Sequence, residues 1–300
     1  MALPIVHSPD FHAELPGGHR FPMGKFRRLA QVLMEEGLAA PGTFHVPVPA
    51  PAEWIAAVHE PGYVRQVFAA AVDPRISREI GLPVTDQVSL RARSACAGSV
   101  LAGQLALQHG IACNTAGGSH HARRAQGAGF CVFNDVAVAI RQLQACGEIE
   151  RALVIDLDVH QGDGTAEIFA GDDSVFTFSM HAEKNYPVRK HPSSRDIALP
   201  DATQDAGYME ILRLALPVII EAAAPDIVFF NAGVDPHADD RLGRLALSDE
   251  GLTERDRTVI GAVRERGIAL AGVLGGGYSN DVDLLARRHA TLHRVAAEFV

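Results

Sequence analysis

The stretch Ala152-Leu-Val-Ile-Asp-Leu-Asp-Val-His160 begins as an apolar run and ends in acids and a histidine. Its first half has the length of a buried strand. Because side chains alternate along a strand, Asp156, Asp158 and His160 share one face at its end. Burying them beside that run is costly unless they are paired or bind a cation. Asp-x-His also supplies a carboxylate oxygen and an imidazole nitrogen, which suit zinc.

The same stretch has a plainer interpretation, as a strand end with a solvated acidic turn, because the pattern is short. Gln161-Gly-Asp-Gly164 forms the expected turn and carries one more acid, and a helical sequence follows over 165–169. In open α/β sheets, ligands bind at the carboxyl ends of strands, which is where these residues fall. The choice between the two interpretations therefore depends on the rest of the chain.

Length and composition predict a single α/β domain over residues 1–300, without a linker-like shift in composition or a repeat. The formal net charge of −9 argues against a general nucleic-acid binder. The basic pair Arg123-Arg124 is therefore interpreted as solvated surface. The sequence does not indicate an oligomeric state.

The cysteines and the apolar runs indicate the cellular compartment in which the protein is expected. The four cysteines include no C-x-x-C pair and are too few for a disulfide framework, so reduced thiols are expected. The first residues lack a signal-like pattern, and no apolar run reaches membrane-spanning length. A cytoplasmic protein without a membrane span is the expectation.

Strand and helix patterns alternate through the second half of the chain. Strands are expected at 111–114, 152–157, 174–180, 225–231 and 268–274, and the principal helices at 23–36, 89–108, 132–146, 207–224, 248–266 and 282–298. A polar loop is expected over 181–200, and a kink or break at Pro217. This alternation predicts a parallel sheet covered by helices on both faces.

Polar segments follow several of these strands. Asp235 lies just beyond the strand at 225–231, Gly275-Gly-Gly-Tyr278 follows the strand at 268–274, and Gly117-Gly-Ser-His-His121 follows the strand at 111–114. Alone, Asp235 is more often a turn or cap residue, and adjacent histidines are often exposed. Because the carboxyl ends of parallel strands share one edge of the sheet, the segments together favour a site.

The residue types in these segments fit metal-assisted hydrolysis of an amide-like bond. Two carboxylates and one imidazole, from Asp158, Asp235 and His160, would leave a fourth zinc position open. Zinc there would make hydroxide available near neutral pH and polarise a carbonyl.

Other side chains then remain for proton transfer. His120 and His121 are the candidate acid and base, and Asp156 and Asp163 could orient them through hydrogen bonds. Tyr278, on a glycine turn, could donate a hydrogen bond to a developing oxyanion.

In this order, the motifs resemble the zinc-dependent histone deacetylase family, which includes bacterial acetoin-utilisation proteins and acetylpolyamine amidohydrolases. The resemblance covers roughly residues 110–280 and rests on the segments Gly117-Gly-Ser-His-His121, Gly129-Phe-Cys131, Asn134-Asp135, Asp156-Leu-Asp-Val-His-Gln-Gly-Asp-Gly164, Ser179-Met-His181, Ala232-Gly-Val-Asp235 and Gly275-Gly-Gly-Tyr278. The segment 181–187 looks most like the class IV branch. Gln161 departs from the pattern, since many relatives carry a histidine there.

The resemblance implies the arginase–deacetylase fold: one α/β domain with a central, mainly parallel eight-stranded sheet and helices on both faces. It implies one zinc ion on Asp158, His160 and Asp235. It also implies roles for the dyads and the tyrosine: His121 as general base and acid with Asp163, His120 as an electrostatic partner with Asp156, and Tyr278 as the group that polarises the acyl carbonyl.

Two further sets of residues follow from the same resemblance. Gly129, Phe130 and Tyr186 would wall a channel for the acyl-lysine stem. A structural potassium ion would lie near Asp156, Asp158, His160, Ser179 and Met180.

The expected substrate is therefore an acylated lysine of a protein, cleaved by a deacetylase or a longer-chain deacylase. An acylated small amine, as for an acetylpolyamine amidohydrolase, is the alternative. A manganese ureohydrolase on the same fold, or a protein that binds acylated ligands without turnover, is a weaker alternative. Acyl-chain length remains open.

Overall fold

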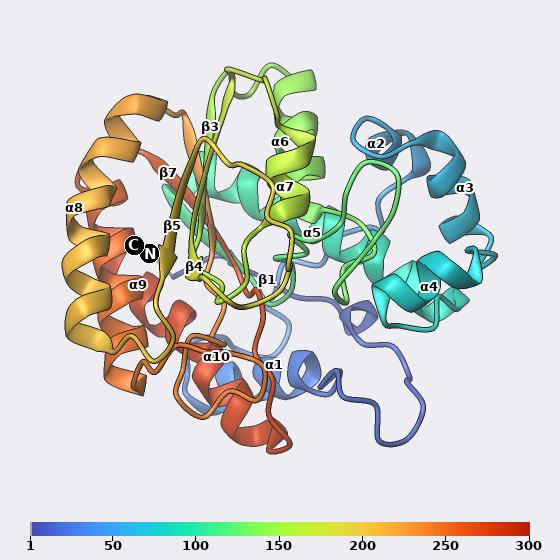
Figure 1. Cartoon of the computed structure of the whole chain (residues 1–300), viewed down its shortest axis with the longest axis horizontal. Coiled ribbons are helices and arrows are strands. Elements are labelled where there is room, and N and C mark those ends of the chain that lie inside the picture. The colour runs from blue at the N-terminus through green and yellow to red at the C-terminus, as the bar shows by residue number, and fades with distance from the viewer. Residues whose placement is uncertain (1) are drawn as a thin grey trace.

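The computed structural model describes residues 2–300 and places one parallel sheet at the centre of the molecule (Figure 1). Its strands are β1 (Ile5–Val6), β2 (Ile111–Asn114), β3 (Ala152–Asp156), β4 (Val175–Ala182), β5 (Arg195–Leu199), β6 (Ile227–Asn231) and β7 (Ala269–Val273). They lie in the order β1-β2-β7-β6-β3-β4-β5, and every neighbouring pair is parallel. The predicted α/β class with a parallel sheet is confirmed.

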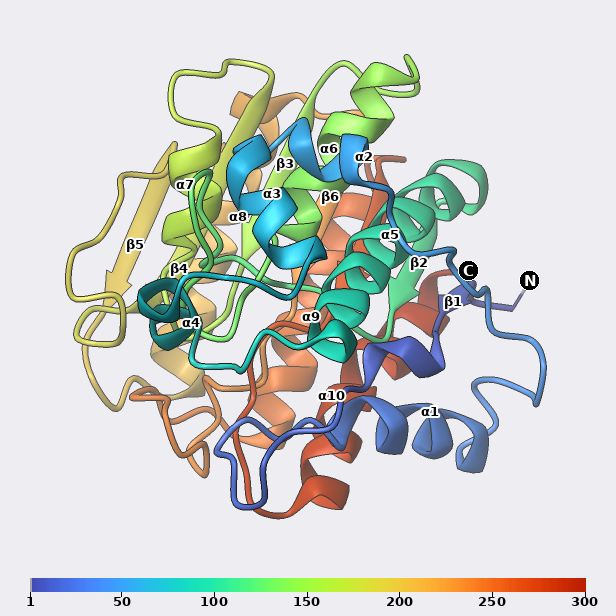
Figure 2. The ribbon, with the colours of Figure 1, turned by 90° about the vertical axis from the view of Figure 1, so that its right-hand side faces the viewer.

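Helices cover both faces of this sheet, which is why β2, β3, β6 and β7 are buried along their whole length. The helices are α1 (Lys25–Glu35), α2 (Ala52–Ala56), α3 (Pro61–Phe68), α4 (Pro74–Ile80), α5 (Asp86–His109), α6 (Asp135–Ala145), α7 (Asp163–Ile168), α8 (Asp205–Ala223), α9 (Asp249–Arg264) and α10 (Val282–Ala296). In Figure 1, α8 and α9 lie on one side of the sheet and α5 and α6 on the other. Figure 2 shows α1 packed along α10.

Small residues let α5 approach the sheet closely. A Cβ atom on Gly98 would lie 2.8 Å from the Asn114 side chain, and one on Gly103 would lie 2.8 Å from Leu143. A larger residue at either point would displace the neighbouring side chain, that of Asn114 in the sheet or that of Leu143 in α6. The helix begins three residues earlier than predicted because Thr85 caps it, its hydroxyl accepting a hydrogen bond from the Val88 amide.

The expected eighth strand is not formed in residues 2–300, which contain a seven-stranded sheet. Outside β1, His45 makes only an isolated parallel bridge to Val6. Pro47 and Pro49 follow it and lack the amide hydrogens that a longer ladder needs. The count of eight is therefore wrong, although the fold class holds.

Two local predictions also differ from the structure. The segment expected as a loop over 181–200 contains the edge strand β5, which pairs with β4 despite its charged and half-exposed residues. Helix α8 continues through Pro217, where a kink or break was expected. Pro217 lies on the exposed face, so water can satisfy the carbonyl that its missing amide leaves free. Among residues 2–300, no helix combines the length and the apolarity needed to cross a bilayer.

Candidate active site

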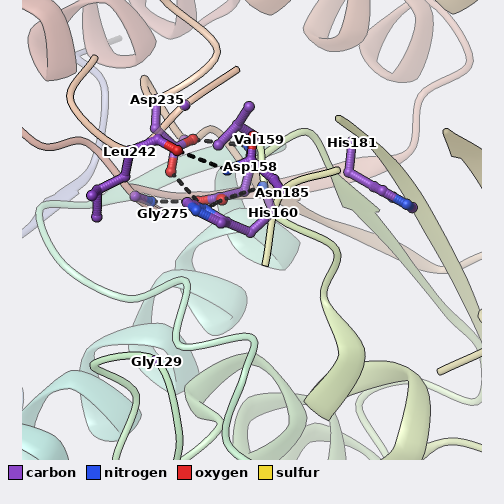
Figure 3. Close-up of polar contacts among 12 residues, drawn as sticks. Gly129, Asp158, Val159, His160, His181, Asn185, Asp235, Leu242 and Gly275 are labelled. Atoms are coloured by element: carbon purple, nitrogen blue, oxygen red, sulfur yellow. Dashed lines mark hydrogen bonds and ion pairs between the residues drawn. The ribbon is translucent and has the colours of Figure 1, made fainter. Parts of the chain in front are cut away.

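Three side chains meet at the carboxyl edge of the sheet, where they were expected. Asp158 and His160 follow β3, and Asp235 follows β6. His160 Nδ1 lies 2.9 Å from Asp158 Oδ1 and 3.2 Å from Asp235 Oδ2. Figure 3 shows the three side chains pointing toward one another, while His181 points away. In residues 2–300 this is the one group of three acidic, cysteine or histidine side chains whose ligand atoms lie within 4.8 Å of one another.

Backbone amides orient both carboxylates. The Val159 amide donates to Asp235 Oδ1 at 2.9 Å, and the Gly276 amide donates to Asp158 Oδ2 at 2.6 Å. The opposite oxygen of each carboxylate therefore faces His160. A Cβ atom on Gly276 would collide with Asp235 Oδ2, so only glycine allows this backbone to pass so close to the cluster.

Within the cluster, the charged form of Asp235 is disfavoured and that of His160 is favoured. Burial and the charge of Asp158 raise the pKa of Asp235 to about 7. Burial opposes charging of His160, but its contacts with Asp158 and Asp235 outweigh that effect and raise its pKa to about 10. Asp235 Oδ2 is buried and accepts no hydrogen bond. Two carboxylates, one imidazole and an unsatisfied oxygen are a donor set that fits a zinc ion.

A first His–Asp dyad lies beside this cluster. His120 Nδ1 is 2.7 Å from Asp156 Oδ2, and the side-chain amide of Asn231 donates from Nδ2 to Asp156 Oδ1 at 2.9 Å. Burial disfavours the charged imidazole, but the negative charges of Asp156 and Asp158 prevail and raise the pKa of His120 to about 9. This dyad therefore favours a positively charged imidazole.

A second dyad joins His121 Nδ1 to Asp163 Oδ1 at 2.6 Å. Arg123 binds the other carboxylate oxygen of Asp163, with its Nη2 at 2.6 Å and its Nε at 3.1 Å. Burial and the charge of His120 lower the pKa of His121 to about 4, against the opposing effect of Asp163. His121 is therefore neutral near pH 7 and can accept a proton.

A buried carboxylate holds the turn that presents both histidines. Asp135, at the start of α6, accepts hydrogen bonds from the Ser119 amide at 2.7 Å and the Gly118 amide at 3.2 Å. Gly117 and Gly118 have φ values of +88° and +82°, which favour glycine. The two histidines thus sit on a turn that is fixed by backbone contacts.

Tyr278 reaches the cluster from the glycine turn after β7. Its amide donates to Asp240 Oδ2 at 2.6 Å, and its ring meets that of His160 edge-on, with 6.2 Å between centroids. Lys25 lies beneath the turn, with Nζ 3.4 Å from the carbonyl oxygens of both Gly275 and Gly277. Burial and the nearby acids raise the pKa of the Tyr278 phenol well above its usual value, so its hydroxyl remains a donor.

The predicted channel residues border a cavity of about 270 Å³ that reaches His121, His160 and Tyr278. The Tyr186 ring stands edge-on to His121, with 4.8 Å between centroids. A Cβ atom on Gly129 would lie 2.6 Å from His121 and 3.2 Å from Tyr186, so the glycine keeps this wall thin. Phe130, with a φ of +67°, is held by a hydrogen bond from its amide to the Ile80 carbonyl.

The residues predicted for potassium lie on β4 and at the end of β3. Ser179 is the register partner of Asp156, and Met180 is fully buried beside it. Ser179 Oγ lies 3.0 Å from His181 Nδ1. The potassium site therefore stays a prediction.

Three contributors were missed from the sequence. Arg123 was interpreted as solvated surface but shares Asp163 with His121. Asn231, the last residue of β6, holds Asp156, and its position at a strand end was the available signal. Lys25 gave no local signal, because its contacts lie about 250 residues along the chain.

Comparison with known proteins places these motifs in a family. The histone deacetylase domain model matches residues 19–293. The chain is 46% identical to an uncharacterized protein of Picosynechococcus sp., over 99% of both chains. It is 30% identical to histone deacetylase 2 of Arabidopsis thaliana, over 91% of this chain and 74% of that protein. A probable deacetylase of Methanothermobacter thermautotrophicus is 28% identical, over 97% of this chain and 89% of that protein.

The fold has a counterpart among solved structures. A crystal structure of the HDA15 HD domain superposes with a TM-score of 0.81 at 20% identity, over 99% of this chain and 89% of that one. This likeness supports the arginase–deacetylase fold that the sequence predicted.

Proposed function

Because the chain belongs to the histone deacetylase family, we propose that it hydrolyses the amide bond of N-acyl-lysine as a zinc-dependent enzyme. The observation that carries this proposal is the convergence of His121, His160 and Tyr278 at the inner end of one cavity. Each of the two neighbouring histidines is paired with a buried carboxylate, as the proposed proton transfers require. We also propose that residues 1–300 form one catalytic domain in the cytoplasm, which the four free cysteines favour.

Asp158, His160 and Asp235 would hold the zinc ion, which when bound would polarise the scissile carbonyl and acidify a water molecule. His121 Nδ1 is engaged with Asp163, so Nε2 is the atom that takes a proton from the attacking water. The same nitrogen then returns the proton to the departing lysine amine. The low pKa of His121 keeps this nitrogen free at neutral pH.

Two other groups stabilise the charge that develops on the acyl oxygen and around it. The Tyr278 hydroxyl, protonated because of its raised pKa, donates a hydrogen bond to the oxyanion. His120, whose ring centroid lies 4.1 Å from that of His121, contributes positive charge nearby. Phe130, Gly129 and Tyr186 enclose the lysine stem and keep water from the reacting bond. A structural potassium ion beside Asp156 and Ser179 remains part of the proposal.

A panel of substrates tests this function. Zinc-loaded protein would be given one lysine peptide carrying acetyl, trifluoroacetyl, octanoyl or myristoyl groups, with acetylputrescine alongside. Release of lysine amine that collapses in Tyr278→Phe would support the mechanism, and the preferred acyl group would identify the substrate. If protein that binds zinc hydrolysed none of these substrates, the proposed hydrolase function would be overturned in favour of binding without turnover. Two metal ions per chain would instead favour a manganese ureohydrolase.

A further inference from the structure

The mouth of the cavity carries two arginines that take no part in the mechanism. Arg20 and Arg78 both line the cavity and are exposed. Neither forms an ion pair with another part of the chain between residues 2 and 300. We propose that this mouth selects acyl-lysines that have an acidic residue on one flank, an inference that rests on the proposed hydrolase function.

Both arginines belong to the wall that contains Phe130. The Arg20 guanidinium carbon lies 5.0 Å from the centre of the Phe130 ring. His19 Nε2 lies 3.1 Å from the carbonyl oxygen of Gly81, which directly follows α4 and its Arg78. The segment before α1 and the end of α4 are thus fixed together on one side of the opening.

A second part of the lining carries no charge of its own, although Lys190 Nζ lies 2.6 Å from the Asn185 carbonyl oxygen. Asn185, Tyr186 and Leu242 form this part, and Figure 3 shows Asn185 and Leu242 on the side of the metal-ligand cluster. The Asn185 side-chain amide donates to the Leu242 carbonyl at 2.7 Å, which joins these two parts of the wall. Among the residues that line the cavity, Arg20 and Arg78 are therefore the exposed cations, whereas the nearby Lys190 is bound to backbone carbonyls.

The charge of the mouth is opposite to that of the chain. Two arginines and Glu79 are the charged residues at its rim, giving a net charge of +1, whereas the whole chain carries −9. Glu79 already accepts a hydrogen bond from the Gln126 side chain. The guanidinium groups of Arg20 and Arg78 therefore offer paired donors to an incoming carboxylate.

This arrangement distinguishes the two substrate classes that the sequence left open. A polyamine brings further positive charges toward Arg20 and Arg78, and these like charges repel one another. An acyl-lysine with a neighbouring glutamate or aspartate brings the opposite charge. Because Lys190 is already bound to backbone carbonyls, the acid should matter most on the flank of the lysine that reaches Arg20 and Arg78.

The test uses acetyl-lysine peptides of one length that carry glutamate before the lysine, glutamate after it, glutamine, or lysine. Zinc-loaded wild type should favour one glutamate peptide over the lysine peptide by about five- to ten-fold in kcat/KM, since exposed ion pairs are individually weak. The double substitution Arg20→Gln with Arg78→Gln should reduce the preference to about two-fold or less. Added salt should reduce it in wild type, because both arginines are exposed.

Arg75→Gln is the matched control. Arg75 is exposed on the same helix, α4, but does not line the cavity. Its substitution should leave the glutamate preference intact. Equal cleavage of the glutamate and lysine peptides by wild type, or an undiminished preference in the double variant, would overturn the inference while leaving the hydrolase function in place.

A binding measurement separates this inference from the proposed function. Tyr278→Phe protein would be titrated with fluorescent versions of the same uncleaved peptides, and the affinity read from fluorescence anisotropy. Tighter binding of one glutamate peptide, lost with both arginine substitutions, would support the mouth selectivity even if no peptide were hydrolysed. Equal affinities for the glutamate and lysine peptides would contradict it.

Discussion

His120 and His121 are neighbours in the sequence, and their ring centroids lie 4.1 Å apart, yet their environments oppose each other. Both rings bond through Nδ1 to a buried carboxylate, at 2.7 Å and 2.6 Å. The pKa of His120 is raised to about 9, whereas that of His121 is lowered to about 4. The same His–Asp contact therefore accompanies opposite protonation states.

The difference comes from the charges around two buried rings: Asp158 adds a second negative charge near His120, whereas His121 lies beside the positive charge of His120. Asp156, the partner of His120, is held by the neutral amide of Asn231, so its charge is not offset there. Asp163, the partner of His121, is shared with the cationic Arg123. A charged His120 further disfavours a second positive charge on His121. Two similar pairs can thus perform different tasks, because the charges around the two rings differ.

The largest expected effect comes from removing a ligand of the cluster that both dyads approach. Asp235→Asn should lower kcat/KM by about 10⁴-fold or more and reduce zinc content, since a bound zinc ion stabilises the transition state by several kcal/mol. Asp239→Asn, an exposed acid on the same loop, is the control. Full activity in Asp235→Asn, or in protein stripped by a chelator, would contradict the metal assignment.

The second prediction compares the dyads directly. His121→Ala should reduce kcat by roughly 10²–10⁴-fold, because it removes the general base and acid. His120→Ala should reduce it less, since this residue contributes charge and does not transfer the proton. Steady-state kinetics on one acetyl-lysine peptide would decide the matter. Equal losses, or a greater loss for His120→Ala, would break the proposed division of tasks.

The third prediction tests the contact between Arg123 and Asp163, which only the second dyad has. Arg123→Gln removes the positive charge beside Asp163, so Asp163 should stabilise protonated His121 more strongly and raise its pKa. A general base is inactive when it is protonated. With a raised pKa, His121 becomes protonated at a higher pH as the solution is acidified, so the acidic limb of the kcat/KM profile should move to higher pH by roughly one unit. Arg123→Lys should restore part of the wild-type profile. Superimposable profiles for wild type and Arg123→Gln would exclude this role.

The smallest expected effect is on stability, and it concerns His59, which contacts the backbone of Arg123. His59 Nδ1 lies 2.8 Å from the Arg123 carbonyl oxygen, and His59 Nε2 accepts the Asn134 amide hydrogen at 2.9 Å. Burial lowers the pKa of His59 from 6.5 to about 4. The folded state therefore favours neutral His59. Its contribution to the free energy of unfolding is at most about 3 kcal/mol, is fully present above pH 6.5 and is lost as the pH falls toward 4.

Urea unfolding at pH 7.5 and pH 5 measures this contribution. His59→Gln should be less stable than wild type at pH 7.5, because a buried hydrogen-bond network is altered. Its free energy of unfolding should then fall less than that of wild type between the two pH values. An equal fall in both proteins would show that His59 is not the titrating group.

Much of this arrangement follows from local sequence patterns. The apolar run of β3 places Asp156 at the strand end and Asp158 and His160 in the bend that follows, and parallel strands bring Asp235 and Tyr278 to the same edge. The role of Arg123 could not be predicted, because it depends on a side chain reaching Asp163 40 residues away. Strand β5 was missed because pairing with β4 overrides a polar, half-exposed sequence.

The most direct test of the account is hydrolysis in water labelled with heavy oxygen. Zinc-loaded protein would be incubated with an acetyl-lysine peptide, and the masses of both products would be measured by mass spectrometry. The account predicts a free lysine amine without label and a released acetate that carries one labelled oxygen from the attacking water. An unchanged peptide in the presence of bound zinc, or label in the peptide product, would contradict it.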